Sequence, residues 1–131
     1  MKRLIKGVFV DIGKEISIEL DDSHSPKTVR AILENLPIEV KINRWGDELY
    51  TDKTQIIEGE EDGKRQVNLF DVAYWPEGNA LCLFYGPTPI SEEGKILAYS
   101  PVNIVGRIIP HNNEKENVLG KIKDSTRVIF K

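Results

Sequence analysis

The stretch from Asp71 to Pro89, DVAYWPEGNALCLFYGPTP, constrains the fold more than any other part of the chain. The apolar side chains around its start alternate between two faces: Phe70, Val72 and Tyr74 on one, and Val67, Leu69, Ala73 and Trp75 on the other. Pro76 ends this strand because it lacks a backbone donor, and Gly78 and Asn79 supply a turn because both tolerate positive φ. The residues after the turn are apolar on both faces: Ala80, Cys82 and Phe84 against Leu81, Leu83 and Tyr85. The stretch therefore predicts a hairpin in the middle of a sheet, with both faces of its second strand covered.

Asp71 is the one carboxylate among these apolar positions. One interpretation places it at a bend, where it faces water. The other pairs it with an arginine beside a pocket, since carboxylates are rarely buried unless they are paired. The residues alone leave both interpretations open.

Alternating apolar residues predict strands along much of the remaining chain. The expected strands are 3–10 and 15–20, which form a first hairpin, then 38–43, 48–51, 56–57, 96–99, 102–109 and 126–130. Polar loops are expected at 59–65 and 91–95. A bend is expected where Arg44-Trp45-Gly46-Asp47 follows the strand at 38–43.

One clear helix is predicted at about 25–36. Ser25 is a suitable N-cap, and Pro26 suits the first helical position, where its missing N–H costs nothing. An apolar stripe follows with helical spacing: Val29, Ile32, Leu33 and Leu36. Pro37 prevents continuation. A second, short helix is predicted at about 113–119, ended by Gly120.

These elements predict a single, mainly β domain over residues 1–131. About eight strands at this spacing favour a closed antiparallel barrel, because closure leaves no unpaired sheet edge. A two-sheet sandwich is the alternative architecture. A chain of this length buries enough surface to fold without a metal or a disulfide.

Composition excludes several classes of function. The net charge is −3 and no basic cluster occurs, so nucleic-acid binding is not expected. No apolar run approaches the length of a membrane span, and the N-terminal MKRLIKGVFVDIG is interpreted as a strand rather than a signal peptide. The single Cys excludes an internal disulfide, which favours a reducing, cytoplasmic location.

No metal or cofactor site is predicted. His24 and His111 lie far apart and lack ligands at metal-binding spacing, and residues 60–62 are expected to form a solvated acidic loop. Cys82 is expected to be a buried, inert thiol because leucines flank it. Asp47 and Glu48 would point to opposite faces of a strand, so they are not expected to act as a carboxylate pair.

Several motifs resemble those of cyclophilins. They are the helix start Ser25-Pro26-Lys27-Thr28-Val29, the strand at 79–85 and the strand Val102-Asn103-Ile104-Val105-Gly106-Arg107-Ile108. The chain is more similar still, over nearly its whole length, to a small prokaryotic cyclophilin-like family of unknown function. The motifs that carry this resemblance are Arg44–Asp47, Ala73–Pro76, Gly78–Leu81 and Phe84–Pro89. It implies a closed, eight-stranded cyclophilin-like barrel, but a fold does not determine an activity.

The resemblance suggests one enzymatic hypothesis, peptidyl-prolyl isomerisation. Arg44 matches the position of the cyclophilin arginine that donates toward the amide nitrogen, so it would be the catalytic residue. The residues that follow Arg44 differ from the cyclophilin pattern, and the loop at 90–95 lacks the tryptophan found there in cyclophilins. Isomerase activity is therefore kept as the alternative function.

The preferred hypothesis is a binding module for an unknown small molecule or a proline-containing peptide. Its expected site residues are Arg44, Trp45, Tyr50, Asp71, Tyr74, Trp75, Phe84 and Tyr85. We expect Arg44 and at least two of the aromatic rings to line one concave surface. Aromatic walls with one guanidinium suit an acidic or carbonyl-bearing ligand. The competing interpretation is that the rings only fill and cover the barrel.

Overall fold

The computed structural model describes residues 1–109 and 118–131. Within these ranges it contains nine strands and two principal helical segments. The strands are β1 (Lys2–Phe9), β2 (Lys14–Asp21), β3 (Ile38–Trp45), β4 (Glu48–Thr51), β5 (Lys64–Val67), β6 (Asp71–Trp75), β7 (Ala80–Phe84), β8 (Ile96–Ile109) and β9 (Thr126–Phe130). The helical segments are the short 3-10 turn η1 (Val10–Ile12) and the α-helix α1 (Pro26–Asn35).

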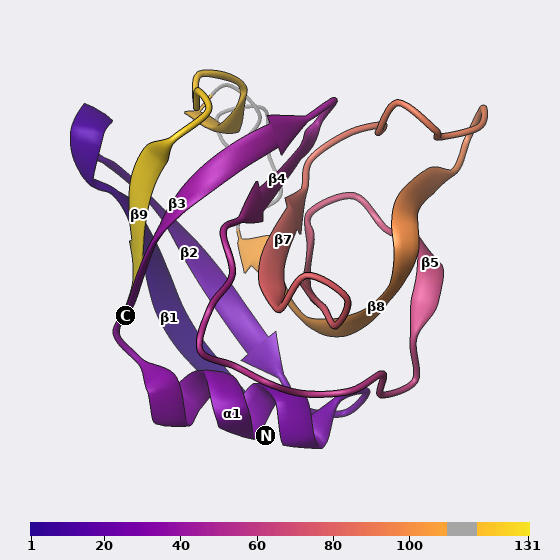
Figure 1. The fold of residues 1–131 in the computed structure, drawn as a ribbon, viewed down its shortest axis with the longest axis horizontal. Coiled ribbons are helices and arrows are strands. Elements are labelled where there is room, and N and C mark those ends of the chain that lie inside the picture. Colours follow the sequence, from indigo (N-terminus) through magenta and orange to yellow (C-terminus); the bar gives the residue numbers. More distant parts are fainter. Residues whose placement is uncertain (110–117) are drawn as a thin grey trace.

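Eight of the described strands close into an antiparallel barrel. Their order is β2-β1-β9-β3-β4-β7-β6-β8, and pairing between β2 and β8 completes the circle (Figure 1). The predicted barrel is therefore confirmed, and the sandwich alternative is wrong. Strand β5 lies outside this circle because it pairs with the first half of β8 alone, from Ile96 to Val102.

The predicted central hairpin is formed by β6 and β7. Val72 pairs with Leu83 and Trp75 with Ala80, so the alternation inferred for both strands is retained. One face belongs to the barrel core: Phe70, Val72, Tyr74, Leu81, Leu83 and Tyr85. The opposite face packs in a second apolar cluster: Val67, Ala73, Cys82, Phe84, Ala98 and Val102. All of β7 is buried because the barrel interior covers one face and the β5–β8 extension covers the other.

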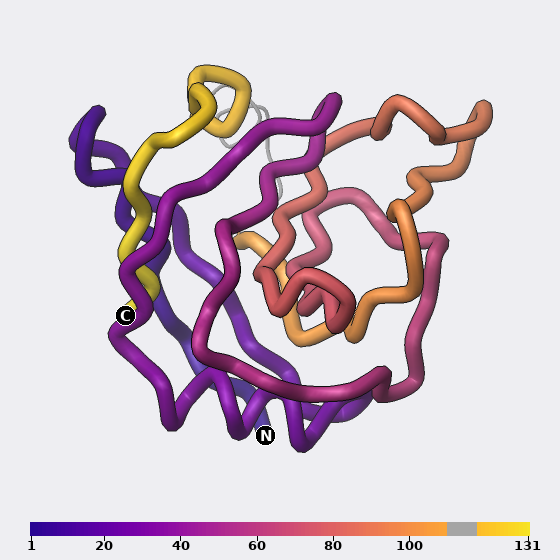
Figure 2. Tube along the Cα trace, viewed as in Figure 1, coloured from indigo at the N-terminus to yellow at the C-terminus, as the bar shows by residue number. Residues whose placement is uncertain are grey.

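Strand β8 is longer than predicted because the expected strands at 96–99 and 102–109 are continuous. Pro101 is tolerated between them because the β5–β8 register shifts there, and proline fits where ladder bonds are interrupted. The second half of β8 is a barrel strand, paired with β6 and β2. The first half leaves the barrel together with β5, on the right of Figures 1 and 2. This extension creates a wall over the outer face of the β6–β7 hairpin.

The prediction of a strand at 56–57 is wrong. This segment is held by hydrogen bonds from side chains rather than by pairing with a neighbouring strand. Ile56 is buried in the core, whereas Ile57 is 82% exposed. The Ile56 carbonyl accepts hydrogen bonds from the Tyr74 hydroxyl (2.8 Å) and the Asn79 amide (3.0 Å). Residues 52–63 therefore form a long loop that passes α1 on its way to β5 (Figure 2).

Helix α1 begins at Pro26 as predicted, but Ser25 does not cap it with its side chain. The Glu61 carboxylate caps it instead, by accepting from the backbone N–H groups of Lys27 and Thr28, both at 3.0 Å. Burial would raise the pKa of Glu61, but these hydrogen bonds and one from the Thr28 hydroxyl outweigh it and lower the pKa. The 60–62 segment is therefore not the fully solvated loop we expected.

The second predicted helix falls largely outside the described residues. Residues 118–120 are helical, and the rest of the 113–119 range cannot be compared with the prediction. No helix in the described ranges is long and apolar enough to cross a membrane.

Candidate functional site

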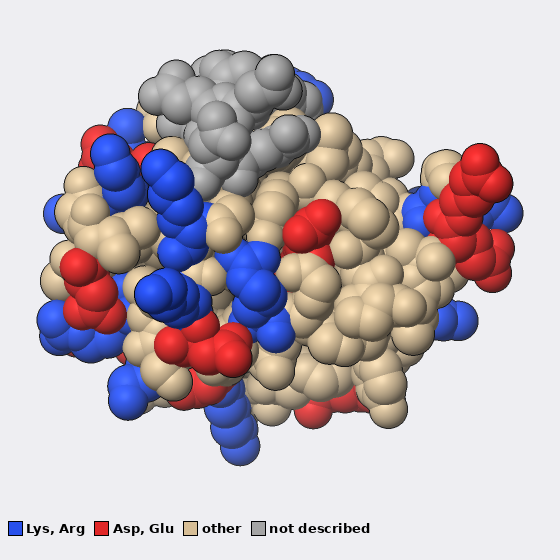
Figure 3. All heavy atoms as spheres, turned by 90° about the horizontal axis from the view of Figure 1, so that it is seen from above, with Lys and Arg blue, Asp and Glu red and all other residues tan. Residues whose placement is uncertain are grey.

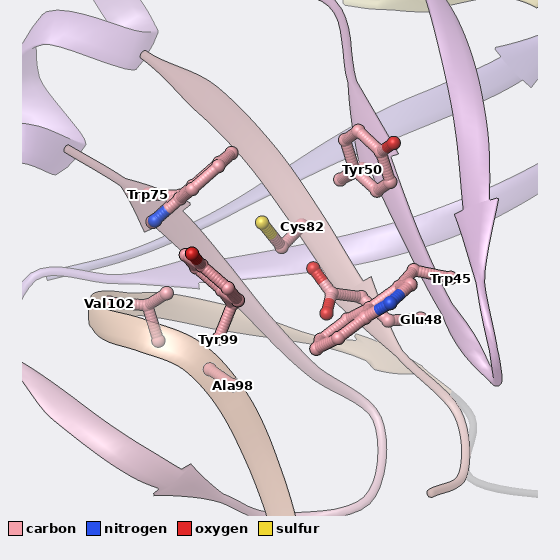
Figure 4. Close-up of a pocket in the computed structure, with 8 residues that line it drawn as sticks. All are labelled: Trp45, Glu48, Tyr50, Trp75, Cys82, Ala98, Tyr99 and Val102. Atoms are coloured by element: carbon pink, nitrogen blue, oxygen red, sulfur yellow. The ribbon is translucent and has the colours of Figure 1, made fainter. Parts of the chain in front are cut away.

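The candidate site is a hollow of about 210 Å³ on the outside of the barrel. We call it the outer hollow. Its walls come from the β3–β4 hairpin, the β6–β7 hairpin and the first half of β8. The lining residues are Trp45, Glu48, Tyr50, Trp75, Cys82, Ala98, Tyr99 and Val102 (Figure 4).

Strand pairing brings the floor and one wall of the outer hollow together. Tyr50 lies opposite Cys82 in the β4–β7 ladder, so the two side chains are neighbours on the same face. Trp45 lies opposite Glu48 across a turn at Gly46 and Asp47, where Gly46 has a φ of 62°. A two-residue turn of this kind places the residues on either side of it on one face. The hollow is thus lined by outward-facing side chains of the barrel.

Three aromatic rings are arranged edge to face around the opening. The Tyr99 ring lies 6.1 Å from the Trp45 ring and 6.2 Å from the Trp75 ring, with interplanar angles of 77° and 82°. The Trp75 indole N–H donates to the Ser100 hydroxyl at 2.6 Å, which fixes the orientation of this ring. Tyr99 is 66% exposed and is the most exposed residue of the lining.

Glu48 is the only acidic residue among the described residues of the lining, and only 6% of its surface is exposed. Figure 4 shows its carboxyl group turned toward Cys82 and the space between the rings. Burial raises the pKa of Glu48 to about 7, and a hydrogen bond with the Cys82 thiol opposes this rise. Among the described residues, this thiol is the one hydrogen-bonding partner of the carboxyl group. Burial, together with the adjacent Glu48, raises the pKa of the Cys82 thiol well above its usual value.

Three of the predicted site residues, Trp45, Tyr50 and Trp75, share the outer hollow. Tyr74 and Tyr85 instead belong to the barrel core, on the opposite face of their strands. Phe84 is fully buried in the outer apolar cluster and does not reach the lining.

Asp71 also lies away from the outer hollow. It is half-buried at the start of β6, and its carboxylate accepts a hydrogen bond from the Asn68 N–H at 2.8 Å. Arg107 is its neighbour in register on β8.

Arg44 corrects our main expectation for the site. Consecutive residues of a strand point to opposite faces, so Arg44 turns away from the side that carries Trp45. Its guanidinium donates to the carbonyls of Leu119 (2.8 Å) and Ile122 (2.7 Å), and to the Tyr85 hydroxyl. The prediction that Arg44 shares a concave surface with the aromatic rings is therefore wrong. The Arg44 guanidinium is therefore not placed to bind an acidic or carbonyl-bearing ligand in the outer hollow.

Sequence reasoning missed five lining residues: Glu48, Cys82, Ala98, Tyr99 and Val102. A signal for Glu48 was present, because a tight turn at Gly46-Asp47 implies that Trp45 and Glu48 share a face. No comparable signal existed for Tyr99. Its position depends on β8 leaving the barrel with β5, which is a tertiary feature.

The surroundings of the outer hollow carry little positive charge. No Lys or Arg among residues 1–109 and 118–131 lines it. In Figure 3, Lys and Arg gather over the side of the molecule that holds β1, β3 and β9, whereas the half with β4, β7 and β8 is mostly uncharged. Within residues 1–109 and 118–131, no group of three or more His, Cys, Asp or Glu side chains is placed to hold a metal ion.

Comparisons with known proteins agree with this architecture. A family model described as cyclophilin-like matches residues 6–131. The solution structure of the hypothetical protein AF2241 from Archaeoglobus fulgidus is 41% identical, with a TM-score of 0.79 over 99% of this chain and 94% of its own. The structure of McbB in complex with tryptophan is 19% identical, with a TM-score of 0.74 over 97% of this chain, and is similar in fold alone. This chain spans 44% of the length of McbB. A comparison with curated protein sequences found no match.

Proposed function

This chain belongs to the cyclophilin-like family, and we propose that it is a binding module that takes a small molecule, or one side chain of a peptide, into the outer hollow. One observation carries the proposal. Glu48 is buried in an almost wholly apolar hollow, yet its carboxyl group has only a thiol as its partner among the described residues. A buried polar group with so few partners is costly unless something else satisfies it.

The size and chemistry of the outer hollow limit its ligand. Its volume of about 210 Å³ lies below the 300–1,000 Å³ typical of pockets for drug-sized molecules. Aromatic walls favour a flat or apolar body, which gains both burial and ring contacts. The ligand is therefore a compact molecule or a single side chain with an apolar body and one polar end.

Isomerase activity loses its support at this site. Catalysis of prolyl isomerisation would need a fixed donor beside a dry pocket for the proline ring. The guanidinium of Arg44, which was to supply that donor, is instead bound to backbone carbonyls on the other face of β3. Binding is therefore the function we propose.

Partners and location follow from the same features. We propose small-molecule or peptide partners rather than nucleic acid, because the net charge is −3 and no cation lines the outer hollow. We also propose a cytoplasmic location, because Cys82 is the only cysteine and is a free, buried thiol.

The two tryptophans of the chain make this proposal easy to test, because both line the outer hollow. Binding of a small aromatic compound should shift the indole N–H resonances of Trp45 and Trp75 and change the intrinsic fluorescence. Since the McbB structure holds tryptophan, tryptophan is a reasonable member of the fragment set to be screened. If no fragment perturbs either tryptophan at millimolar concentration, the proposed function is wrong.

Tyr99→Ala locates the binding site of any fragment found. The Tyr99 ring is exposed, so its removal should weaken binding about tenfold through lost ring contact while the fold persists. Ile57→Ala is the matched control, because Ile57 is also exposed but lies in the 52–63 loop and not in the lining. Equal affinities for the two variants would place the ligand elsewhere.

A further inference from the structure

We propose that the ligand of the outer hollow is an organic ammonium cation that pairs with the Glu48 carboxylate inside the surrounding aromatic rings. This inference rests on the proposed binding function and names the chemical class that the function requires. The expected charge of the ligand is opposite to the one suggested by the sequence, because the ionisable group in the hollow is the Glu48 carboxyl group and not the Arg44 guanidinium.

Aromatic rings surround the acidic group of the outer hollow. Trp45, Tyr50, Trp75 and Tyr99 all contribute to the lining that also contains Glu48 (Figure 4). The faces of aromatic rings attract cations, tryptophan most strongly, and the attraction grows when the cation is removed from water. Several rings around one carboxylate therefore suit an ammonium group in two ways. The rings can form cation–π contacts with it, and the carboxylate can form an ion pair with it.

No internal counter-charge lies beside Glu48 in the part of the chain that the structure describes. Eight described residues line the outer hollow, and none of them is Lys or Arg. An ionised carboxylate in such a place is unfavourable until a cation compensates it. A ligand that brings a positive charge supplies the compensation, whereas a neutral ligand does not and an anion opposes it.

The side chains that line the outer hollow with Glu48 come from five strands. Strand β7 contributes Cys82, β4 contributes Tyr50 and β8 contributes Tyr99, and Figure 4 shows the Cys82 thiol beside the Glu48 carboxyl group. Strands β3 and β6 contribute the two indoles of Trp45 and Trp75. Burial raises the pKa of Glu48 to about 7 and moves the pKa of the Cys82 thiol well above its usual value.

This chemistry couples binding to a proton. A bound cation favours the carboxylate over the carboxylic acid, so it lowers the pKa of Glu48. Below about pH 7, binding of the cation must then release a proton, and affinity must rise with pH until the carboxyl group is ionised. An anionic ligand should show the opposite trend, because only the protonated acid can donate a hydrogen bond to it.

The experiment compares three probes that share a phenyl body: 2-phenylethylammonium, 3-phenylpropionate and the neutral 2-phenylethanol. Each is titrated at about pH 5.5 and pH 8.5, with the Trp45 and Trp75 indole resonances as the readout. We expect the affinity for the ammonium probe to rise about tenfold between the two values, that for the alcohol to stay constant and that for the acid to fall. Calorimetry in two buffers of different ionisation enthalpy should register the released proton.

Glu48→Gln isolates the charge. This variant should lose the preference for the ammonium probe over the alcohol, and its affinity for the ammonium probe should no longer depend on pH. Glu39→Gln, on an exposed part of β3, is the matched control and should retain both. The pH profile of the wild-type protein tests the same inference without relying on either variant.

The outcomes separate this inference from the proposed function. If the alcohol binds and the ammonium probe binds no better at high pH, the outer hollow is a binding site but the cation is wrong. A preference for 3-phenylpropionate would also overturn the cation. If none of the probes perturbs the tryptophans, both the inference and the proposed function fail.

Discussion

Arg44 and Glu48 lie on neighbouring strands only a few residues apart, yet the protein uses their charges in opposite ways. The Arg44 guanidinium, at the interior side of β3, donates to Gly46, Leu119, Ile122 and Tyr85. The Glu48 carboxyl group, on the outer side of β4, has only the Cys82 thiol among the described residues. Four residues accept hydrogen bonds from the Arg44 guanidinium, whereas the Glu48 carboxyl group has one hydrogen-bonding partner among the described residues.

The comparison shows how a structural charge differs from a candidate functional one. A guanidinium that satisfies several backbone carbonyls secures the segment that contains them, here residues 119–122 against the β3–β4 hairpin. A buried carboxyl group with so few partners instead weakens the fold when it ionises. Hydrogen-bond satisfaction, rather than the presence of charge near a pocket, distinguishes the two.

Replacing Arg44 should have the largest effect on stability. Arg44→Ala should lower the free energy of unfolding by about 3 kcal/mol, because the carbonyls of Leu119 and Ile122 lose a charged donor. Chemical denaturation measures the change. Arg107→Ala is the control, since Arg107 is exposed and its ion pair with Glu19 is long, at 3.7 Å, so its loss should cost at most about 1 kcal/mol. Equal losses of stability in the two variants would show that the hydrogen bonds of Arg44 to these carbonyls do not stabilise the fold.

Glu48→Gln should produce a pH-dependent effect of the opposite sign. The folded protein holds a proton on Glu48 up to about pH 7, whereas the usual pKa is 4.5, so stability is lost as pH rises between these values and stays low above them. Relative to wild type, the variant should therefore gain up to about 3 kcal/mol between about pH 4 and pH 8.5. Denaturation curves at both pH values measure this gain. A constant difference between variant and wild type would show that Glu48 titrates normally.

Glu61, like Arg44, is a charged residue whose side chain forms hydrogen bonds with the backbone, so we expect it to stabilise the fold. Glu61→Ala should cost about 1.5 kcal/mol, because the N–H groups of Lys27 and Thr28 at the start of α1 lose their acceptor. The pKa of Glu61 is lowered, so its contribution should be present above the usual pKa of 4.5 and should disappear in acid. Glu60→Ala, at an exposed neighbouring position, should change the stability by less than about 0.5 kcal/mol. A similar loss from both variants, in thermal or urea unfolding, would contradict the capping role.

Tyr99→Ala should have the smallest effect on stability of the four, below about 0.5 kcal/mol, because most of the ring is already in water. Its expected effect on ligand affinity is much larger. A small effect on stability together with a larger effect on affinity is what we expect of a residue that lines the outer hollow and does not belong to the core. A loss of more than about 2 kcal/mol in urea unfolding would show that Tyr99 serves the fold instead.

The sequence predicted local patterns well and tertiary contacts poorly. Alternation along 70–85 correctly grouped Tyr74 with Val72 and Cys82 with Phe84, because the two-residue period of a strand is a local property. The same period places Arg44 and Trp45 on opposite faces of β3, which is why they cannot share the outer hollow. The capping of α1 by Glu61 and the position of Tyr99 both depend on loops and strands that meet across the fold, and no spacing in the chain encodes such meetings.

The long strand β8 has a consequence for how proteins with this architecture diverge. Residues 103–109 are needed to close the barrel, because they pair with β6 and β2. Residues 96–102 pair only with β5 among the strands and contribute Ala98, Tyr99 and Val102 to the outer hollow. Substitutions at residues 96–102 should therefore reshape the outer hollow without breaking the pairing that closes the barrel. One continuous strand thus serves both as part of the scaffold and as one wall of the hollow.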